Sequence, residues 1–266
     1  MNNPVKDKLA AGQTVLCLCV RMARTPDIAA MALAAGFDAL YVDLEHSAIS
    51  VDDASSICAA ALGFGVTPLV RVPEGDLGMA PRLLDNGAMG VILPHVETAE
   101  RARDLVDASL FPPEGKRSAV GSTVQLGFEA MGQAAIAERL NRLTLSTVMI
   151  ETEKGVANAD EIAAVPGIDM VMVGTNDLSA AMGIAGQIES DAIRDACQIV
   201  ADACVRHGKI FALGGVRGDA ALAADYAAMG ARFIIAGMDA TYLLAAAKAD
   251  IVSIRAALNE RSGTTG

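Results

Sequence analysis

The sequence predicts a (β/α)₈ barrel, the α/β fold in which eight parallel strands alternate with eight helices. Three observations lead to this prediction. A helical stretch that ends in Gly and is followed within one to three residues by an apolar strand recurs at 35–42, 86–93, 166–173 and 229–235. The length of 266 residues is close to the roughly 250 of a typical barrel. The composition, 53% apolar but only 3% aromatic, suits a core of Ala, Val, Leu, Ile and Met.

The strands are expected where short apolar runs are bounded by polar residues or Gly, a pattern typical of strands buried on both faces. In order, they are 15–20, 39–42, 67–72, 90–93, 144–150, 168–173, 209–213 and 231–235. Amphipathic segments predict helices near 26–35, 51–62, 76–86, 97–108, 158–165, 189–206, 218–229 and 239–260. The Gly residues between them fit the left-handed position that ends a helix. A doubly wound open sheet is the alternative architecture.

The whole chain, 1–266, is expected to form one barrel domain with a long insertion at 111–143 after the fourth strand. A loop of this length beside the carboxyl edge of a barrel usually contributes to a functional site.

Composition excludes several classes of protein. The net charge of −11 argues against a nucleic-acid partner, which needs a basic surface. No apolar run approaches the roughly 18 residues of a membrane span. The first eight residues lack the apolar region of a signal peptide. Five cysteines, an odd number in apolar surroundings, are expected to be reduced core residues of a cytoplasmic protein: Cys17, Cys19, Cys58, Cys197 and Cys204.

Two predicted strands end at an acidic residue. Glu151 follows the apolar run 147–150, and Asp177 follows the run 168–173 after a short polar stretch. If these strands are neighbours in a parallel sheet, both carboxylates lie at its carboxyl edge, where α/β folds bind ligands. Each acid could instead cap or solvate its own strand. Together they favour a site for a hard divalent cation.

The second and third strands also end in charged residues. Arg71 lies inside a buried apolar run, which is costly unless its guanidinium meets an anion, a carbonyl oxygen or a structural carboxylate. Asp43 or Glu45 could be that carboxylate. Because Glu45 and His46 would face opposite ways in a regular strand, the chain must turn there and present at least one of them to the barrel mouth.

Two other positions carry weaker signals. Asp85 ends the third helix, where an acid opposes the helix dipole, so another role is expected for it. His95 follows the fourth strand and is expected to be structural or to support the site from behind.

Six motifs stand out in order along the chain: Asp43-Leu44-Glu45-His46, Val70-Arg71-Val72-Pro73, Leu84-Asp85-Asn86-Gly87, Phe111-Pro112-Pro113-Glu114-Gly115-Lys116-Arg117, Ile150-Glu151-Thr152, and Gly174-Thr175-Asn176-Asp177-Leu178-Ser179-Ala180-Ala181-Met182-Gly183. From about residue 5 to 250 the chain thereby resembles the HpcH/HpaI family of class II, pyruvate-dependent aldolases. The resemblance implies a barrel of the phosphoenolpyruvate/pyruvate superfamily, in which a divalent cation holds a 2-oxoacid.

The resemblance also implies roles. Glu151 and Asp177 match the metal ligands, and Arg71 matches the residue that contacts the 2-oxo group and stabilises its enolate. His46 with Asp85 resembles the acid/base dyad of the family.

Further implied roles concern the surroundings of the metal and the substrate. Glu45 resembles a residue near a metal-bound water. The amides of Asn176 and Asp177, beside Gly174 and Thr175, match the donors to the substrate carboxylate.

These implied roles agree with the chemistry of the residues. Two carboxylates, two oxygens of a 2-oxoacid and two waters form an octahedral oxygen set suited to Mg²⁺, Mn²⁺ or Co²⁺. A Schiff-base mechanism is disfavoured because no lysine lies within the carboxyl end of a strand, and only Lys154 is near one.

The chain departs from the family pattern at two positions. Leu44 stands where Gly is common, and Met149 stands where Gln is common, two residues before Glu151. Met149 has the same strand parity as Glu151 and should lie just beneath the metal, where it cannot hydrogen-bond as Gln would. The departures bear on the substrate preference, not on the fold or the metal site.

The predicted activity is that of a lyase: reversible cleavage of a 4-hydroxy-2-oxoacid to pyruvate or hydroxypyruvate and an aldehyde. One alternative is a CoA-ester Claisen lyase of the citrate lyase β or malyl-CoA lyase type, which would need a basic groove for CoA. A second is a non-catalytic metabolite-binding member of the family.

The last predicted helix suggests an oligomer. Leu243, Leu244, Ala247, Ile251, Ile254 and Leu258 form an apolar stripe at helical spacing within 239–258. The stripe could pack on its own barrel. The high apolar content, and a family that swaps this helix within dimers, favour exchange between subunits. We therefore expect a symmetric homo-oligomer, a hexamer built as a trimer of dimers.

Overall fold

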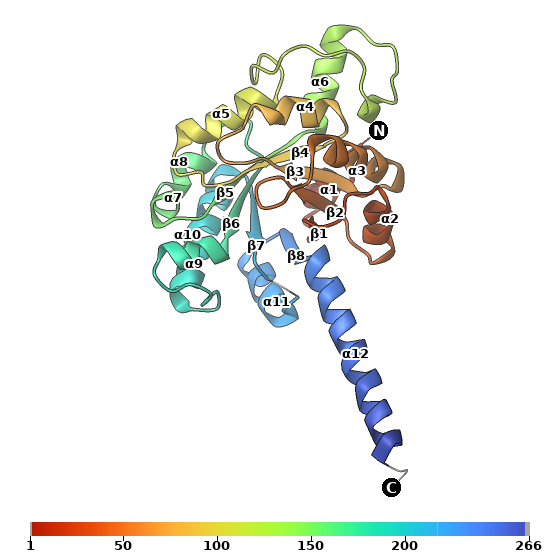
Figure 1. Cartoon of the computed structure of the whole chain (residues 1–266). Helices are drawn as coiled ribbons and strands as arrows, with labels where there is room; N and C mark the ends of the chain where they lie inside the picture. Colours follow the sequence, from red (N-terminus) through yellow and green to blue (C-terminus); the bar gives the residue numbers. More distant parts are fainter. Residues whose placement is uncertain (1, 217, 264–266) are drawn as a thin grey trace.

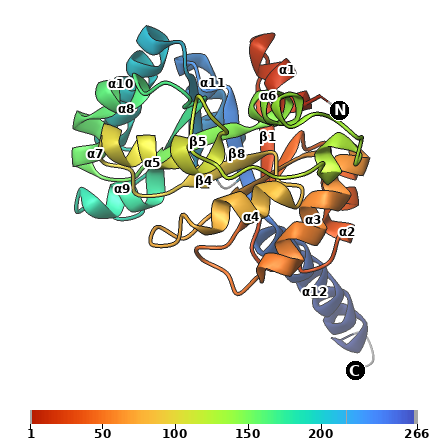
Figure 2. The same cartoon turned by 90° about the horizontal axis from the view of Figure 1, so that it is seen from above.

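The computed structural model describes residues 2–216 and 218–263 and shows a closed barrel of eight parallel strands in sequential order (Figures 1 and 2). This confirms the predicted fold and excludes the doubly wound sheet. The strands are β1 (Val15–Val20), β2 (Ala39–Asp43), β3 (Thr67–Arg71), β4 (Gly90–Leu93), β5 (Leu145–Ile150), β6 (Met170–Gly174), β7 (Ile210–Gly214) and β8 (Phe233–Met238).

Helices follow most strands at the predicted places. They are α1 (Pro4–Ala10), α2 (Asp27–Ala34), α3 (Val51–Phe64), α4 (Met79–Asp85), α5 (Ala99–Ser109), the 3₁₀ turn η1 (Val124–Leu126), α6 (Gln133–Leu143), α7 (Glu153–Ala157), α8 (Ala159–Ala163), α9 (Thr175–Ala181), α10 (Asp191–His207), α11 (Ala220–Met229) and α12 (Asp239–Gly263). The predicted helix at 158–165 is preceded by a separate turn of helix, α7. Two short helices, α1 and α9, were not predicted from periodicity.

The strands alternate between an inner and an outer core. Residues that face the barrel interior form one apolar cluster, and the intervening residues pack against the helices: the inner cluster includes Cys17, Cys19, Tyr41, Leu69, Ile92, Met149, Met170 and Met172. Because successive side chains of a strand point to opposite faces, this parity continues to Asp43, Arg71 and Glu151. These charged side chains therefore lie over the carboxyl end of the barrel.

The insertion 111–143 lies at the opposite end of the barrel from the carboxyl edge, contrary to the sequence prediction. It follows α5, which has already returned the chain to the side where the strands begin. The side-chain amide of Gln125 donates to the carbonyl oxygens of Leu84 and Ala88, just before β4 begins. Within one chain, this loop cannot contribute to the carboxyl-end site.

Helix α12 leaves the barrel instead of covering it. Figure 1 shows it projecting from the end of β8 into open space. Near its start it contacts β1 and β8 of its own barrel, and the predicted stripe is exposed, with Leu243, Ile254 and Leu258 each more than half accessible. The alternative that this helix packs on its own barrel is wrong for this structure.

Candidate active site

A buried cluster of opposite charges occupies the carboxyl end of the barrel. Asp43 is paired with Arg71 in the register of β2 and β3. The Arg71 Nε lies 2.9 Å from Asp43 Oδ1, and Nη2 lies 2.6 Å from Oδ2, a bidentate pair. A second guanidinium, that of Arg21, donates its Nε to the same Oδ2 at 2.5 Å. Burial would raise the pKa of Asp43, but hydrogen bonds and charge from Arg71 and Arg21 hold it below its ordinary value.

These contacts explain how an arginine is tolerated in a buried strand. Arg71 is 3% exposed, and its charge is met by Asp43 and by Glu45, whose Oε2 lies 3.1 Å from Nη1. The structural carboxylate considered from the sequence is therefore present. The same Nη1 also faces the sulfur of Met149 at 3.9 Å.

Asp43 also shapes the turn that was expected after β2. Its Oδ1 accepts hydrogen bonds from the backbone amides of Glu45 and His46 at 3.2 and 3.3 Å. The turn keeps the Glu45 side chain buried beside Arg71 and leaves the His46 ring 45% exposed. His46 Nε2 lies 3.8 Å from Glu45 Oε2. His46 is therefore in place to meet a ligand that enters from solvent.

Glu151, the first residue after β5, is 2% exposed. Its Oε2 accepts a hydrogen bond from the backbone amide of His95 at 2.9 Å, and His95 holds this position in a left-handed conformation, at φ 52°. Burial raises the pKa of Glu151 to about 7; the amide and charge of His95 and the charge of Arg71 oppose the shift, and Asp177 adds to it.

His95 lies between Glu151 and Glu45 at the barrel mouth. Its Nδ1 lies 3.4 Å from Glu151 Oε2, and its Nε2 lies 3.7 Å from Glu45 Oε1. His95 therefore lies against both carboxylates, and the supporting role expected for it from the sequence stays a prediction.

The segment after β6 closes the site beside Glu151. A side-chain carbon at Gly174 would lie only 2.6 Å from Glu151 Oε1, so the carboxylate requires glycine there. Thr175 is buried and donates its hydroxyl to the Gly214 carbonyl oxygen at 3.0 Å. Asp177 is exposed in the first turn of α9, and Asn176 is half-buried.

The donor set fits a hard divalent cation held together with a substrate. Glu151 is a buried carboxylate that has Asp177 as an acidic neighbour, and two such charges are stabilised by a cation. Within residues 2–216 and 218–263, no group of three or more His, Cys, Asp or Glu side chains is arranged to hold a metal alone. Mg²⁺ typically uses one or two carboxylates and takes its remaining ligands from substrate and water.

The structure does not bring His46 and Asp85 together in one chain. His46 follows β2 at the carboxyl end of the barrel, whereas Asp85 ends α4 on the side where β4 begins. Asp85 Oδ1 instead accepts a hydrogen bond from Arg117 Nη2 at 2.6 Å, and the Arg117 guanidinium lies 4.5 Å from the Phe111 ring centroid. The implied dyad therefore requires the Asp85 of a second subunit.

Both departures from the family pattern are buried. Met149 is 4% exposed and lies inside the barrel beneath the charged cluster, as strand parity predicted. Leu44 joins the outer core. Met149 adds an apolar surface to the floor of the site and places only sulfur beside Arg71.

The geometry defines an enzyme site of the barrel type, with acidic side chains and a buried guanidinium assembled at the carboxyl ends of the strands. Residues 18–246 match the HpcH/HpaI aldolase/citrate lyase family, and the chain belongs to that family.

Individual relatives narrow the class. The chain is 43% identical over 245 residues to a 4-hydroxy-4-methyl-2-oxoglutarate aldolase of Hapsidospora irregularis, covering 91% of this chain and 90% of the relative. It is 35% identical over 249 residues to a hydroxypyruvate/pyruvate aldolase of Deinococcus radiodurans, and the match covers 93% of this chain and 88% of the relative. The solved structure of an HpcH/HpaI aldolase from Desulfitobacterium hafniense DCB-2 superposes with a TM-score of 0.89 at 32% identity. The superposition covers 94% of this chain and 96% of that structure. The predicted class is confirmed: the chain is an aldolase, a carbon–carbon lyase.

No helix in the described residues is both long and apolar enough to cross a membrane. All five cysteines are buried free thiols, as predicted.

Proposed function

We propose that the chain catalyses the reversible, metal-dependent cleavage of a 4-hydroxy-2-oxoacid to pyruvate or hydroxypyruvate and a second carbonyl compound. The observation that carries the proposal is the convergence of Glu151 and Arg71 at the barrel mouth. Glu151 would hold there the cation to which the 2-oxoacid binds, and the fixed guanidinium of Arg71 would stabilise the enolate that forms when the carbon–carbon bond breaks.

Glu151 and Asp177 would hold the cation, which we take to be Mg²⁺, Mn²⁺ or Co²⁺. When bound, it supplies Lewis-acid polarisation of the 2-oxo oxygen. The amides of Asn176 and Asp177 would donate to the substrate carboxylate, and Gly174 leaves room for Glu151 beside them.

The remaining side chains of the site have separate proposed roles. Arg71 is fixed by Asp43, so its guanidinium is oriented before the substrate binds. His46 is exposed and would transfer a proton to or from the 4-hydroxyl oxygen. Asp85 of a neighbouring subunit would orient the His46 ring, and Glu45 would support the proton transfers near the cation.

The two relatives support a 2-oxoacid as donor. One is named for a 4-hydroxy-4-methyl-2-oxoglutarate and the other for hydroxypyruvate and pyruvate. The apolar sulfur of Met149 under Arg71 favours pyruvate, because it offers the additional hydroxyl of hydroxypyruvate no strong hydrogen-bond partner.

A donor and acceptor panel tests this reaction. Purified protein with Mg²⁺, Mn²⁺ or Co²⁺ is incubated with pyruvate or hydroxypyruvate and a series of aldehydes and 2-oxoacids, and products are identified by mass spectrometry. We expect 4-hydroxy-2-oxoacids, in larger yield from pyruvate. The absence of carbon–carbon bond formation across the panel would contradict the proposed reaction.

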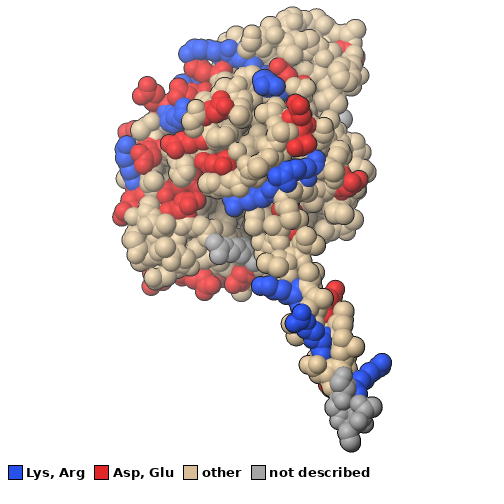
Figure 3. Space-filling model, viewed as in Figure 1, with Lys and Arg blue, Asp and Glu red and all other residues tan. Residues whose placement is uncertain are grey.

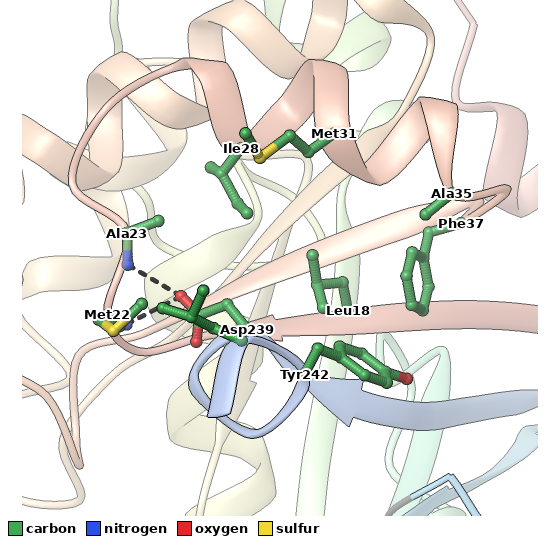
Figure 4. A pocket seen from close by; sticks show the side chains of 10 residues that line it. Leu18, Met22, Ala23, Ile28, Met31, Ala35, Phe37, Asp239 and Tyr242 are labelled. Atoms are coloured by element: carbon green, nitrogen blue, oxygen red, sulfur yellow. Dashed lines mark hydrogen bonds between the residues drawn. The ribbon is translucent and has the colours of Figure 1, made fainter. Parts of the chain in front are cut away.

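We also propose that the protein is a cytoplasmic hexamer, a trimer of dimers, in which α12 is exchanged between subunits. The outer wall between α2 and the start of α12 forms an apolar groove of about 660 Å³ (Figure 4). Leu18, Ile28, Met31, Ala35, Phe37 and Tyr242 line it. An exposed apolar helix and an open apolar groove on the same chain are complementary surfaces.

Light scattering with one pair of variants tests the exchange. Ile254→Asp places a charge in the α12 stripe, and we expect it to shift the oligomer towards monomer because burying an unpaired carboxylate is costly. Ala256→Asp adds the same charge on the opposite face of the helix and should leave the oligomer intact. A fully active wild-type monomer of 27.3 kDa would contradict the exchange.

A further inference from the structure

Arg21 is a charged residue at the barrel mouth that the reaction described above does not use. It follows β1 directly and shares the parity of Cys17 and Cys19, which face the barrel interior. Its side chain is 33% exposed. Only its Nε has a hydrogen-bond partner among the described residues, the Asp43 carboxylate, so both Nη groups are available.

The backbone of this arginine is held firmly. The carboxylate of Asp239, which is buried, accepts hydrogen bonds from the amides of Arg21, Met22 and Ala23 at 3.1, 2.9 and 2.8 Å. Figure 4 shows the last two of these contacts. With the backbone fixed by Asp239 and Nε fixed by Asp43, the free edge of the guanidinium has a defined position.

The charge on Asp43 does not require a second guanidinium. Arg71 already occupies both oxygens of that carboxylate with a bidentate pair. Arg71 also pairs with Glu45 at 3.1 Å, so the two guanidinium groups and the two carboxylates balance in charge, and Arg21 adds an open donor edge to this group. A guanidinium with two open Nη groups in a partly buried position is a suitable partner for a carboxylate.

We infer that Arg21 binds a carboxylate on the acceptor, so that the preferred acceptors are carbonyl compounds with an adjacent carboxylate rather than neutral aldehydes. The inference rests on the proposed aldol reaction. The donor carboxylate is assigned to the amides of Asn176 and Asp177, beside Glu151. Arg21 lies across the mouth on β1, next to Arg71, and therefore faces the other half of the new bond.

A structural role for Arg21 makes a different prediction. If the side chain served only to hold Asp43 and thereby Arg71, its loss would slow reactions of charged and neutral acceptors equally. Acceptor charge is therefore the readout that separates recognition from structural support.

The test compares glyoxylate with glycolaldehyde, two small acceptors that differ in a carboxylate and a hydroxymethyl group. Pyruvate and Mg²⁺ or Mn²⁺ are held constant, and kcat/KM is measured for wild type, Arg21→Met, Arg21→Lys and Arg24→Met. Arg24 is a matched control, because it is exposed on the same loop and donates to the carbonyl oxygen of Met22.

We expect wild type to prefer glyoxylate. Arg21→Met should lower the glyoxylate-to-glycolaldehyde ratio by about 10- to 100-fold, as expected for loss of hydrogen bonds to a charged group. The loss should lie mainly in the KM for glyoxylate. Arg21→Lys should retain most of the wild-type preference for glyoxylate over glycolaldehyde, and Arg24→Met should retain it fully.

The outcomes separate the inference from the reaction on which it rests. Turnover of both acceptors with the same ratio in wild type and Arg21→Met would overturn the role of Arg21 alone. An equal loss for both acceptors would assign Arg21 to structural support and also overturn the inference. Failure of wild type to join pyruvate to either acceptor would overturn the aldol reaction and this inference together.

Discussion

Replacing Arg71 by Ala is expected to slow both aldol cleavage and the exchange of pyruvate C3 protons with solvent by about 10²- to 10³-fold. Both processes pass through the same enolate, and Arg71 is the buried guanidinium fixed beside the site by Asp43. Loss of one donor to a developing oxyanion typically costs about 10²- to 10³-fold in rate. Exchange is followed by proton NMR in D₂O, and cleavage by release of pyruvate.

The stability of the Arg71 variant must be checked because the substitution opens a buried ion pair, which can cost about 3–5 kcal/mol. Arg21 still pairs with Asp43 and offsets part of this cost. Arg71→Lys keeps a positive charge but loses the bidentate geometry, and it should also be strongly impaired. A folded Arg71 variant that exchanges pyruvate protons at the normal rate would show that Arg71 does not stabilise the enolate.

His46→Ala should separate the two steps. His46 is assigned to the 4-hydroxyl oxygen, so its loss should lower aldol cleavage by about 10²- to 10⁴-fold, the range for general acid–base catalysis. Pyruvate proton exchange should remain measurable. Equal loss of exchange in the His46 and Arg71 variants would instead make His46 the base that forms the enolate.

Glu151→Gln and Asp177→Asn are expected to remove metal binding and activity while leaving the barrel folded. Each substitution keeps the size of the side chain and removes one ligand charge. Loss even of a residue that supports a metal ligand costs about 10- to 100-fold in affinity, so loss of a ligand should cost at least the upper value. Mn²⁺ binding is measured by calorimetry, and folding by circular dichroism.

Glu153→Gln is the matched control. Glu153 is exposed in the first turn of α7, two residues after Glu151, and the substitution makes the same chemical change. It should bind Mn²⁺ as wild type does. Wild-type affinity in both Glu151→Gln and Asp177→Asn would rule out the two-carboxylate site.

The positions of the strands, and the edge of the sheet that carries the site, could be predicted because patterns of neighbouring residues indicate them. The Gly-then-strand pattern located four strand starts, and acidic residues at the ends of two neighbouring strands placed Glu151 and Asp177 on the same edge. Parity within a strand then placed Met149 beneath Glu151 inside the barrel. Each of these inferences uses residues close together in sequence.

Contacts between elements were harder to predict. The pairing of Asp43 with Arg71 depends on the register of β2 and β3, and the sequence offered Asp43 only as one of two possible partners. The contribution of Arg21 to the same carboxylate was missed. Strand parity would have pointed Arg21 into the mouth, because it lies two residues after the inward-facing Cys19.

Two features, the partner surface of α12 and the place of the insertion, are not encoded by periodicity. The apolar stripe of α12 showed that something must cover the helix but did not show which surface. The insertion 111–143 was associated with the carboxyl edge because it follows the fourth strand, but it begins only after α5 has crossed back to the other end. The same reversal separates Asp85 from His46.

The charge distribution bears on the alternative as a CoA-ester lyase. On the face shown in Figure 3, acidic and basic side chains are intermingled over the barrel. All three relatives reported above are named aldolases, and no observation in the described residues favours CoA recognition.

Cleavage of 4-hydroxy-4-methyl-2-oxoglutarate by metal-stripped protein tests the metal-dependent mechanism most directly. The protein is treated with EDTA, desalted and checked for residual metal by mass spectrometry, and pyruvate release is then followed before and after addition of Mg²⁺ or Mn²⁺. We expect no cleavage without metal and recovery of cleavage when metal is added. Full-rate cleavage by protein free of metal would contradict the proposed class II mechanism.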